Sequence, residues 1–113
     1  WFCGLMAATP TVAGADTLAS HSGWTEFTSY DETNRVAWSP TRTNQSIANS
    51  SAMVFTISAN SSTVGGAFIA GVNTGTSGVL MCGAAFTGGN KTGLNDNDVL
   101  NVTYTFSAAD DGV

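Results

Sequence analysis

The chain has 113 residues, of which 42% are hydrophobic and only 10% charged, and its formal net charge is −5. This length allows one domain with a modest core. Binding to nucleic acid or to an anionic membrane surface needs several cations that act together. The three basic residues, Arg35, Arg42 and Lys91, are scattered among eight acids, so the composition argues against both roles.

The abundant small polar residues indicate a β-protein. Ser and Thr together number 28, beside 13 Gly and nine Asn. Thr suits a pleated surface, and Gly and Asn suit turns. No apolar run approaches the roughly 20 residues of a membrane-spanning helix. The chain opens in an apolar segment without an initiator Met or a signal-peptide pattern. We therefore expect one domain over residues 1–113 that lacks an upstream N-terminal segment.

The N-terminal third predicts one strand and a set of irregular segments. Trp1–Met6 is apolar and predicts a first strand. Ala7–Ala15 is a loop of small residues. Asp16–His21 predicts a single helical turn, with Asp16 as its N-cap and Gly23 beyond its end.

The next stretch is harder to assign. Gly23–Tyr30 alternates in polarity, but neither face is cleanly apolar, so it predicts a strand or an extended loop. Asp31–Arg35 predicts a polar turn. Val36–Trp38 is a brief strand that cannot continue through Pro40, which lacks a backbone donor. Residues 41–51 are polar and rich in Asn, Ser and Thr.

The second half shows sharper strand patterns. Met53–Ile57 places its apolar residues on one face, and Thr63–Val72 is a longer apolar strand. Val79–Phe86 is nearly all apolar, so both of its faces should be covered. Asn97–Phe106 alternates with a period of two, which predicts one buried and one wet face. Its buried face should carry Leu100, Val102, Tyr104 and Phe106.

Four successive strands with polar turns predict an antiparallel meander, and the earlier segments can cover one of its faces. The sequence therefore predicts an all-β fold. We expect a single antiparallel β-sandwich domain, jelly-roll or Ig-like, with six to eight strands and at most a short helical turn.

The reactive side chains do not form a recognisable catalytic set. His21 lies near Asp16, Ser20 and Ser22 in sequence, but adjacency in sequence is not the geometry of a triad. A surface or capping histidine is the simpler interpretation. The acidic pairs at residues 31–32 and 110–111 are interpreted as solvated turn and tail charges rather than glycosidase carboxylates. We predict that the chain is not an enzyme.

Metal, disulfide and glycan sites have weak signals. Asp96-Asn97-Asp98 offers oxygens to calcium, but it lacks the rest of an EF-hand loop and also suits an ordinary Asx turn. Cys3 and Cys82 lie inside apolar runs, so we expect free buried thiols, with a disulfide as the alternative. We predict no metal and no cofactor. Five Asn-x-Ser/Thr sequons reflect the composition, at Asn44, Asn49, Asn60, Asn90 and Asn101.

Aromatic residues are the remaining candidates for function. Four of them crowd into the irregular stretch from residue 24 to residue 38. They can close the core, form an interface or stack on sugar rings. The apolar N-terminal segment can dock on a neighbour as an added strand. The candidate interface residues are Trp1, Phe2, Trp24, Phe27, Tyr30 and Trp38.

One run of residues, Ala15–Glu26, is followed by Tyr30–Arg35 and Ala37-Trp38. This run resembles a group of small virion-associated proteins of tailed bacteriophages. Val36 stands where these proteins usually have Pro. The resemblance covers nearly the whole chain, because similar segments follow at Gly66–Ile69, Leu80–Phe86 and Asp98–Tyr104.

The resemblance implies a bacteriophage structural protein of the virion. It implies a capsid decoration (cement) protein on the capsid surface that stabilises the head lattice by non-covalent contacts. Its expected partners are the major capsid protein and copies of itself, with a trimer as one candidate homo-oligomer. The alternative is a tail-fibre or host-adhesion module that recognises surface glycans through Trp24, Tyr30 or Trp38. Neither interpretation includes a catalytic residue.

Overall fold

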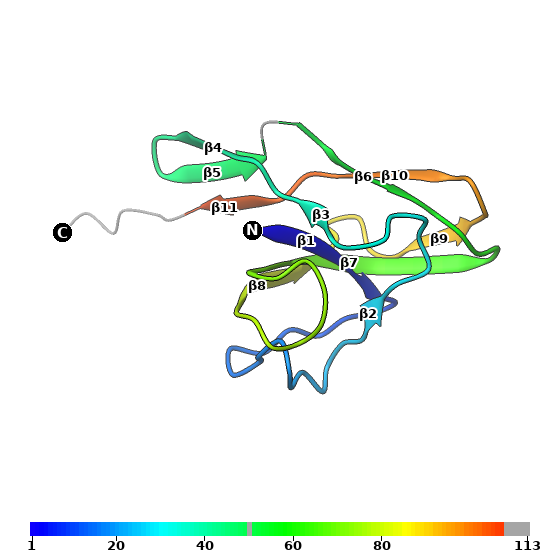
Figure 1. The fold of residues 1–113 in the computed structure, drawn as a ribbon, viewed down its shortest axis with the longest axis horizontal. Helices are drawn as coiled ribbons and strands as arrows, with labels where there is room; N and C mark the ends of the chain where they lie inside the picture. Colours follow the sequence, from blue (N-terminus) through cyan, green and yellow to red (C-terminus); the bar gives the residue numbers. More distant parts are fainter. Residues whose placement is uncertain (50, 108–113) are drawn as a thin grey trace.

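The computed structural model describes residues 1–49 and 51–107, and this part of the chain is all-β, with eleven strands and no helix (Figure 1). It accordingly has no helix long and apolar enough to cross a membrane. The predicted antiparallel β-sandwich is confirmed. The strands are β1 (Phe2–Ala7), β2 (Glu26–Phe27), β3 (Val36–Ala37), β4 (Pro40–Thr43), β5 (Ser46–Asn49), β6 (Met53–Thr56), β7 (Ser62–Ala70), β8 (Leu80–Ala85), β9 (Lys91–Leu94), β10 (Val99–Val102) and β11 (Thr105–Ser107).

The strands outnumber the six to eight expected from the sequence because polar segments without a strand pattern also form paired strands. β4 and β5 form a hairpin within the polar residues 40–49, and Asn44 takes a positive φ of 52° at its turn. Asn adopts that conformation more readily than most residues. β9 lies in the polar stretch between the predicted strands Val79–Phe86 and Asn97–Phe106, where the sequence predicts a turn, and it pairs with β7. Polar strands of this kind have no hydrophobic period to predict them.

One six-stranded sheet forms the middle of the molecule. Its order is β2-β1-β7-β8, with β3 also paired to β1 and β9 to β7, and every pairing is antiparallel. β1 and β7 are its central strands, and their residues are buried almost continuously. Continuous burial along a strand means that both faces are covered.

The second strand layer covers one face of this sheet. β6 pairs with β10, and β4-β5-β11 form a three-stranded sheet that lies beside this pair in Figure 1. The predicted closing strand over residues 97–106 is therefore two strands, β10 and β11, separated at Thr103 and Tyr104. Val102 is buried, while the side chain of Phe106 lies outside the described residues. The core between the layers contains Cys3, Leu5, Trp38, Met53, Phe55, Val64, Ala67, Ile69 and Val102.

The loop between β1 and β2 covers the other face of the sheet. Its Leu18 and Trp24 pack against Met6, Phe68 and Ala70. The helical turn predicted for residues 16–21 is wrong. Residues 17 and 20 exchange backbone hydrogen bonds of 2.9 and 3.2 Å and close a turn instead. So short a segment gains too few hydrogen bonds to nucleate a helix, and tertiary packing decides its conformation.

We predict that Phe68→Ala destabilises the protein by about 3–5 kcal/mol, because it empties a fully buried site between the sheet and the loop layer. The Phe68 ring lies 5.0 Å from the Trp24 ring, and a Cβ at Gly4 would collide with it. Urea unfolding measures the loss. Val54→Ala is the control, since Val54 is 45% exposed and should change stability by less than about 0.5 kcal/mol. Equal losses would contradict the central position of Phe68.

Candidate functional site

The predicted interface residues are divided between core and surface. Trp24 and Trp38 are each only 5% exposed, so their rings belong to the two cores. Phe2, Phe27 and Tyr30 are half-buried. Trp1 is 50% exposed. The two later tryptophans therefore belong to the core, which is one of the three roles considered for the aromatic residues. Trp1 is the candidate interface residue with the most exposed ring.

A buried ion pair organises the stretch that contains these aromatics. Arg35 is 5% exposed and contacts Glu26 through two hydrogen bonds of 2.9 and 2.8 Å. Its guanidinium also donates to the carbonyl oxygens of Val72 and Gly75 at 3.0 and 2.9 Å. The same group lies 5.2 Å from the centre of the Phe68 ring, a cation–π distance. Arg35 thus ties β2 to the loop that leads from β7 to β8.

The acidic turn at residues 31–32 fastens the second strand layer. Both carboxylate oxygens of Glu32 accept the backbone N–H of Thr56, at 3.1 and 3.0 Å. The N–H of Asp31 donates to the Thr56 carbonyl at 2.8 Å. Tyr30 forms a bridge to Ile57 and packs edge-on against Phe55. The Glu32 carboxylate therefore has a structural role in this part of the fold.

His21 serves the loop layer rather than a catalytic triad. Its ring stacks on Trp24 with a centroid distance of 3.6 Å, and its Nδ1 lies 2.7 Å from the Trp24 carbonyl oxygen. Because a carbonyl oxygen can only accept, Nδ1 carries the proton. The Asp16 carboxylate accepts the Trp24 indole N–H at 3.2 Å and the Ala13 N–H at 2.9 Å. The imidazole and this carboxylate therefore both hold Trp24 in place, through different groups of that residue.

The candidate calcium stretch forms an ordinary turn. Asp98 accepts the N–H of Asn95 through its side chain at 2.7 Å and returns a backbone bond of 2.9 Å. Asn97 takes the positive φ of 72° that Asx residues tolerate. In residues 1–49 and 51–107 no group of three or more His, Cys, Asp or Glu is placed to hold a metal ion.

The prediction that Val79–Phe86 is covered on both faces is wrong for the isolated chain. Val79 is 64% exposed, Ala84 and Ala85 are exposed, and Leu80–Gly83 are only half-buried. β8 lies at the edge of the six-stranded sheet, where the two covering layers cover its residues only in part. Its one strand neighbour in the described part of the chain is β7. An apolar run predicts burial, but it does not distinguish a covered strand from an edge strand that lacks a partner.

The free edge of β8 presents identifiable backbone groups. Phe86 donates its N–H to the Gly65 carbonyl at 2.9 Å, so its amide faces β7. Backbone groups alternate in direction along a strand. The groups of Ala84 and Cys82 therefore also face β7, and those of Gly83 and Ala85 face outward. No charged residue occurs from Val79 to Phe86.

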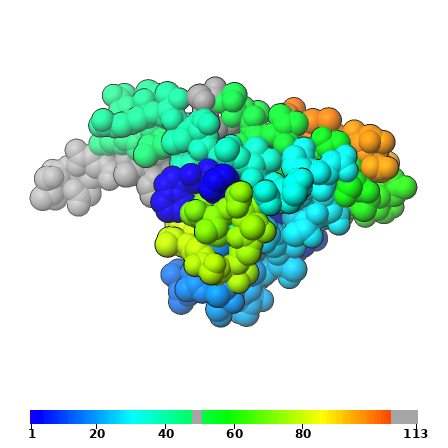
Figure 2. All heavy atoms as spheres, viewed as in Figure 1, coloured from blue at the N-terminus to red at the C-terminus, as the bar shows by residue number. Residues whose placement is uncertain are grey.

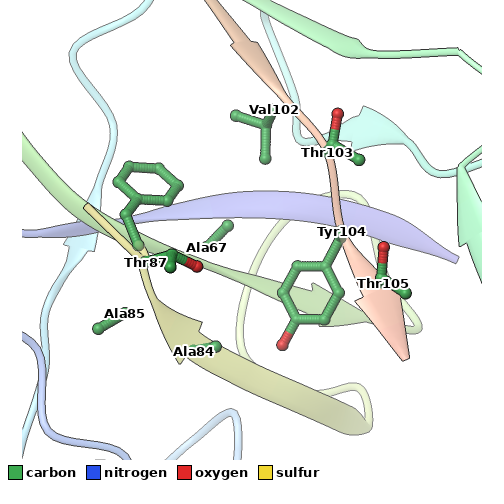
Figure 3. Close-up of a pocket in the computed structure, with 9 residues that line it drawn as sticks. Ala67, Ala84, Ala85, Thr87, Val102, Thr103, Tyr104 and Thr105 are labelled. Atoms are coloured by element: carbon green, nitrogen blue, oxygen red, sulfur yellow. The ribbon is translucent and has the colours of Figure 1, made fainter. Parts of the chain in front are cut away.

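A shallow groove lies on each face of β8. The first has a volume of about 250 Å³ and separates β8 from the segment Val102–Thr105. Figure 3 shows the Tyr104 ring extending from that segment toward the strand that carries Ala84. The second groove, of about 380 Å³, lies between β8 and Val12–Gly14. Both grooves leave β8 less covered than β7.

The exposed apolar surface continues from β8 to the N-terminus. Gly71 lies beside both Trp1 and Val79, since a Cβ at this glycine would be 3.7 Å from the Trp1 ring and 3.8 Å from the Val79 backbone. Figure 2 shows the N-terminal atoms, in blue, against the yellow-green segment that precedes β8. Trp1 and Val79 are among the most exposed large hydrophobic residues of the chain. We call this surface, from Trp1 through Val79 along β8, the β8 edge.

The two cysteines are free thiols, as expected. They lie on opposite sides of Ile69 in the sheet, because Cys3 and Cys82 both pair with it. Two strand spacings, roughly 10 Å, separate their Cα atoms, which is beyond the reach of a disulfide. Burial raises the pKa of Cys3 to about 12 and also raises the pKa of Cys82, which accepts a hydrogen bond from Tyr104. Cys3 is fully buried, but Cys82 is only half-buried.

Known proteins offer no further guide. No family model, no curated protein and no solved structure matches this chain. Its function is therefore inferred from the β8 edge and from the residues that hold the scaffold around it.

We predict that Glu26→Gln destabilises the protein by about 2–3 kcal/mol, because it leaves the Arg35 charge buried with weaker hydrogen bonds. Urea unfolding measures the change. Asp31→Asn is the matched control in the same stretch, since the Asp31 side chain is exposed and should contribute less than about 0.5 kcal/mol. If both variants lose the same stability, the ion pair does not support the fold as described.

We predict that stability falls as pH rises from about 9 to 12. Burial raises the pKa of Cys3 from 9.0 to about 12 and that of Tyr30 from 10.0 to about 12. Each group is neutral when protonated and negatively charged when it is not. Because burial disfavours the charged form, the folded state holds the proton more tightly than the unfolded chain. The stabilisation is complete below the unfolded pKa values and is lost as pH rises through the folded ones. Urea midpoints at pH 8, 10 and 11 measure this loss, which Tyr30→Phe should reduce between pH 10 and 11. A flat profile would contradict it.

Proposed function

We propose that this chain is a bacteriophage structural protein, a capsid decoration (cement) protein that stabilises the head lattice by non-covalent contacts. The observation that carries the proposal is the β8 edge. Monomeric proteins generally protect a sheet edge with charged residues, proline or a covering segment. β8 contains six residues without charge or proline, and its outward backbone groups face away from its one described neighbour. Such an edge suits a protein that works in an assembly.

The phage-like run of residues supports a scaffold role. Glu26 and Arg35 from this run form the buried ion pair, and Glu32 fastens the second strand layer. Trp24 and Trp38 fill the two cores. The residues that carry the resemblance are therefore those that make the domain rigid. A rigid domain with a free assembly edge is what a cement protein requires, and no catalysis is proposed.

The expected partners are the major capsid protein and copies of this chain on the virion surface. A decoration protein binds in many copies, so each contact can be weak while the lattice gains much stability. Strand addition at a free edge supplies backbone hydrogen bonds without demanding a deep pocket. The shallow grooves beside β8 are consistent with this mode.

The alternative role, recognition of surface glycans, loses two of its three residues. Trp24 and Trp38 are buried, so their faces are not available to sugar rings. Tyr30 is half-buried and packs against Phe55. We therefore retain glycan binding only as one outcome of the test below.

We predict that virions lacking this protein release their DNA at a lower temperature than complete virions. Adding back the wild-type protein should restore heat resistance, and Ala84→Lys should restore it poorly, because it places a charge on the exposed β8 edge. Thr41→Lys on exposed β4 is the control and should act like wild type. Equal heat and osmotic resistance with and without the protein would refute the cement role. Binding on a glycan array would support the adhesion alternative.

A further inference from the structure

We infer that the partner of the β8 edge is β8 of a second copy of this chain, paired antiparallel about a two-fold axis. This pairing rests on the proposed function, because it names the first partner that the chain would bind in the virion assembly. The pairing would join the six-stranded sheets of two copies into one continuous sheet. Three features of β8 favour a second copy over a foreign strand.

The first feature is the direction of the backbone groups. Gly83 and Ala85 direct their N–H and C=O groups away from β7. An antiparallel copy presents the same outward groups in the reverse order, so each donor can meet an acceptor. A two-fold axis uses one surface twice, which makes the self-pair the simplest way to satisfy this edge.

The second feature is the distribution of charge. Two copies of a chain with net charge −5 repel each other. The segment from Val79 to Phe86 has no charge. The Arg35 guanidinium, which reaches the loop before β8, is paired with the Glu26 carboxylate of β2. Asp16 lines the second groove, where the Trp24 indole and the Ala13 N–H bind its carboxylate. The β8 edge is thus a surface on which two copies can approach with little repulsion.

The third feature is the order of large and small side chains along β8. In a pair centred on Gly83, Cys82 lies opposite Ala84 of the second copy. Met81, which a bulge leaves without a partner on β7, lies toward Ala85 of the second copy. Each larger side chain therefore faces a smaller one. Gly83 itself carries no side chain, and a Cβ there would lie 2.5 Å from the Met6 methyl group, which would have to move. The two backbones can meet at this glycine without obstruction.

The contact is expected to be weak in isolation. Two six-residue strands bury less than the roughly 800 Å² per partner of a standard stable interface. The dimer should therefore form in a concentration-dependent way. In a lattice of many copies, weak pairing of this kind becomes effective because each copy is held near its neighbours.

The test compares the oligomeric state of the 113-residue chain with that of edge variants. Sedimentation velocity should show a monomer–dimer equilibrium as concentration rises to about 100 µM or above, as expected for a small interface. Ala85→Pro removes an outward N–H and leaves the bonds to β7 intact, so it should fold normally and weaken dimerisation at least about tenfold. Ala84→Lys should weaken it in the same way, and Thr41→Lys should not. Circular dichroism and melting temperature verify that each variant folds.

The register has its own test. Cys82 and residue 84 of the second copy form a pair without mutual hydrogen bonds, with Cα atoms about 4.5 Å apart, which suits a disulfide. Mild oxidation of Ala84→Cys should therefore give a covalent dimer, and Ala84→Cys combined with Cys82→Ala should give much less. Absence of this cross-link in a chain that dimerises would overturn the Gly83-centred register.

Failure of the inference is distinguishable from failure of the proposed function. A wild-type chain that remains monomeric at about 100 µM, or an Ala85→Pro variant that dimerises as well as wild type, overturns the self-pair. If the monomeric chain still protects virions and Ala85→Pro does not, the edge binds another virion protein instead. If the chain dimerises through β8 but leaves virion stability unchanged, the self-pair stands and the cement role fails.

Discussion

The two central strands, β1 and β7, carry apolar side chains on both faces, and the rest of the structure depends on keeping both faces from water. β6 and β10 cover one face, and the loop with Leu18 and Trp24 covers the other. The covers are complete over the middle of the sheet and only partial over β8, where Leu80–Gly83 are half-buried and Ala84 and Ala85 are exposed. The exposed edge is thus a consequence of how the domain distributes its apolar surface, rather than a separate feature added to it.

Arg35 holds the segments that cover the central sheet in place. It binds Glu26 on β2, two carbonyl groups of the loop before β8, and the face of the Phe68 ring. One buried charge thereby joins three parts of the chain that are distant in sequence. A buried ion pair adds little stability compared with an apolar replacement, but removal of one partner is costly. Its role here is therefore to define one arrangement of the loops around the sheet.

The sequence predicted the fold class and the best-patterned strands because a period of two, or a long apolar run, reports local burial directly. Met53, Phe55 and Val102 are buried as their alternation indicates, and β7 begins one residue before its predicted apolar run and ends within it. Other features depend on which segments meet in space. The burial of Trp24 and Trp38 follows from covers formed by irregular segments. The exposure of Val79 and Ala84 follows from the position of β8 at a sheet edge, which no local pattern encodes.

The position of β8 at a sheet edge also explains why recognition there should use backbone pairing. A groove that selects a ligand by side chains needs depth and oriented polar groups. The grooves beside β8 are shallow, and the nearby thiol and phenol of Cys82 and Tyr104 are hydrogen-bonded to each other. The edge strand instead offers outward N–H and C=O groups, whose hydrogen bonds form only with another strand or with water. An added strand forms hydrogen bonds with these backbone groups. It also covers the apolar side chains of β8, so one contact satisfies the backbone and buries the side chains.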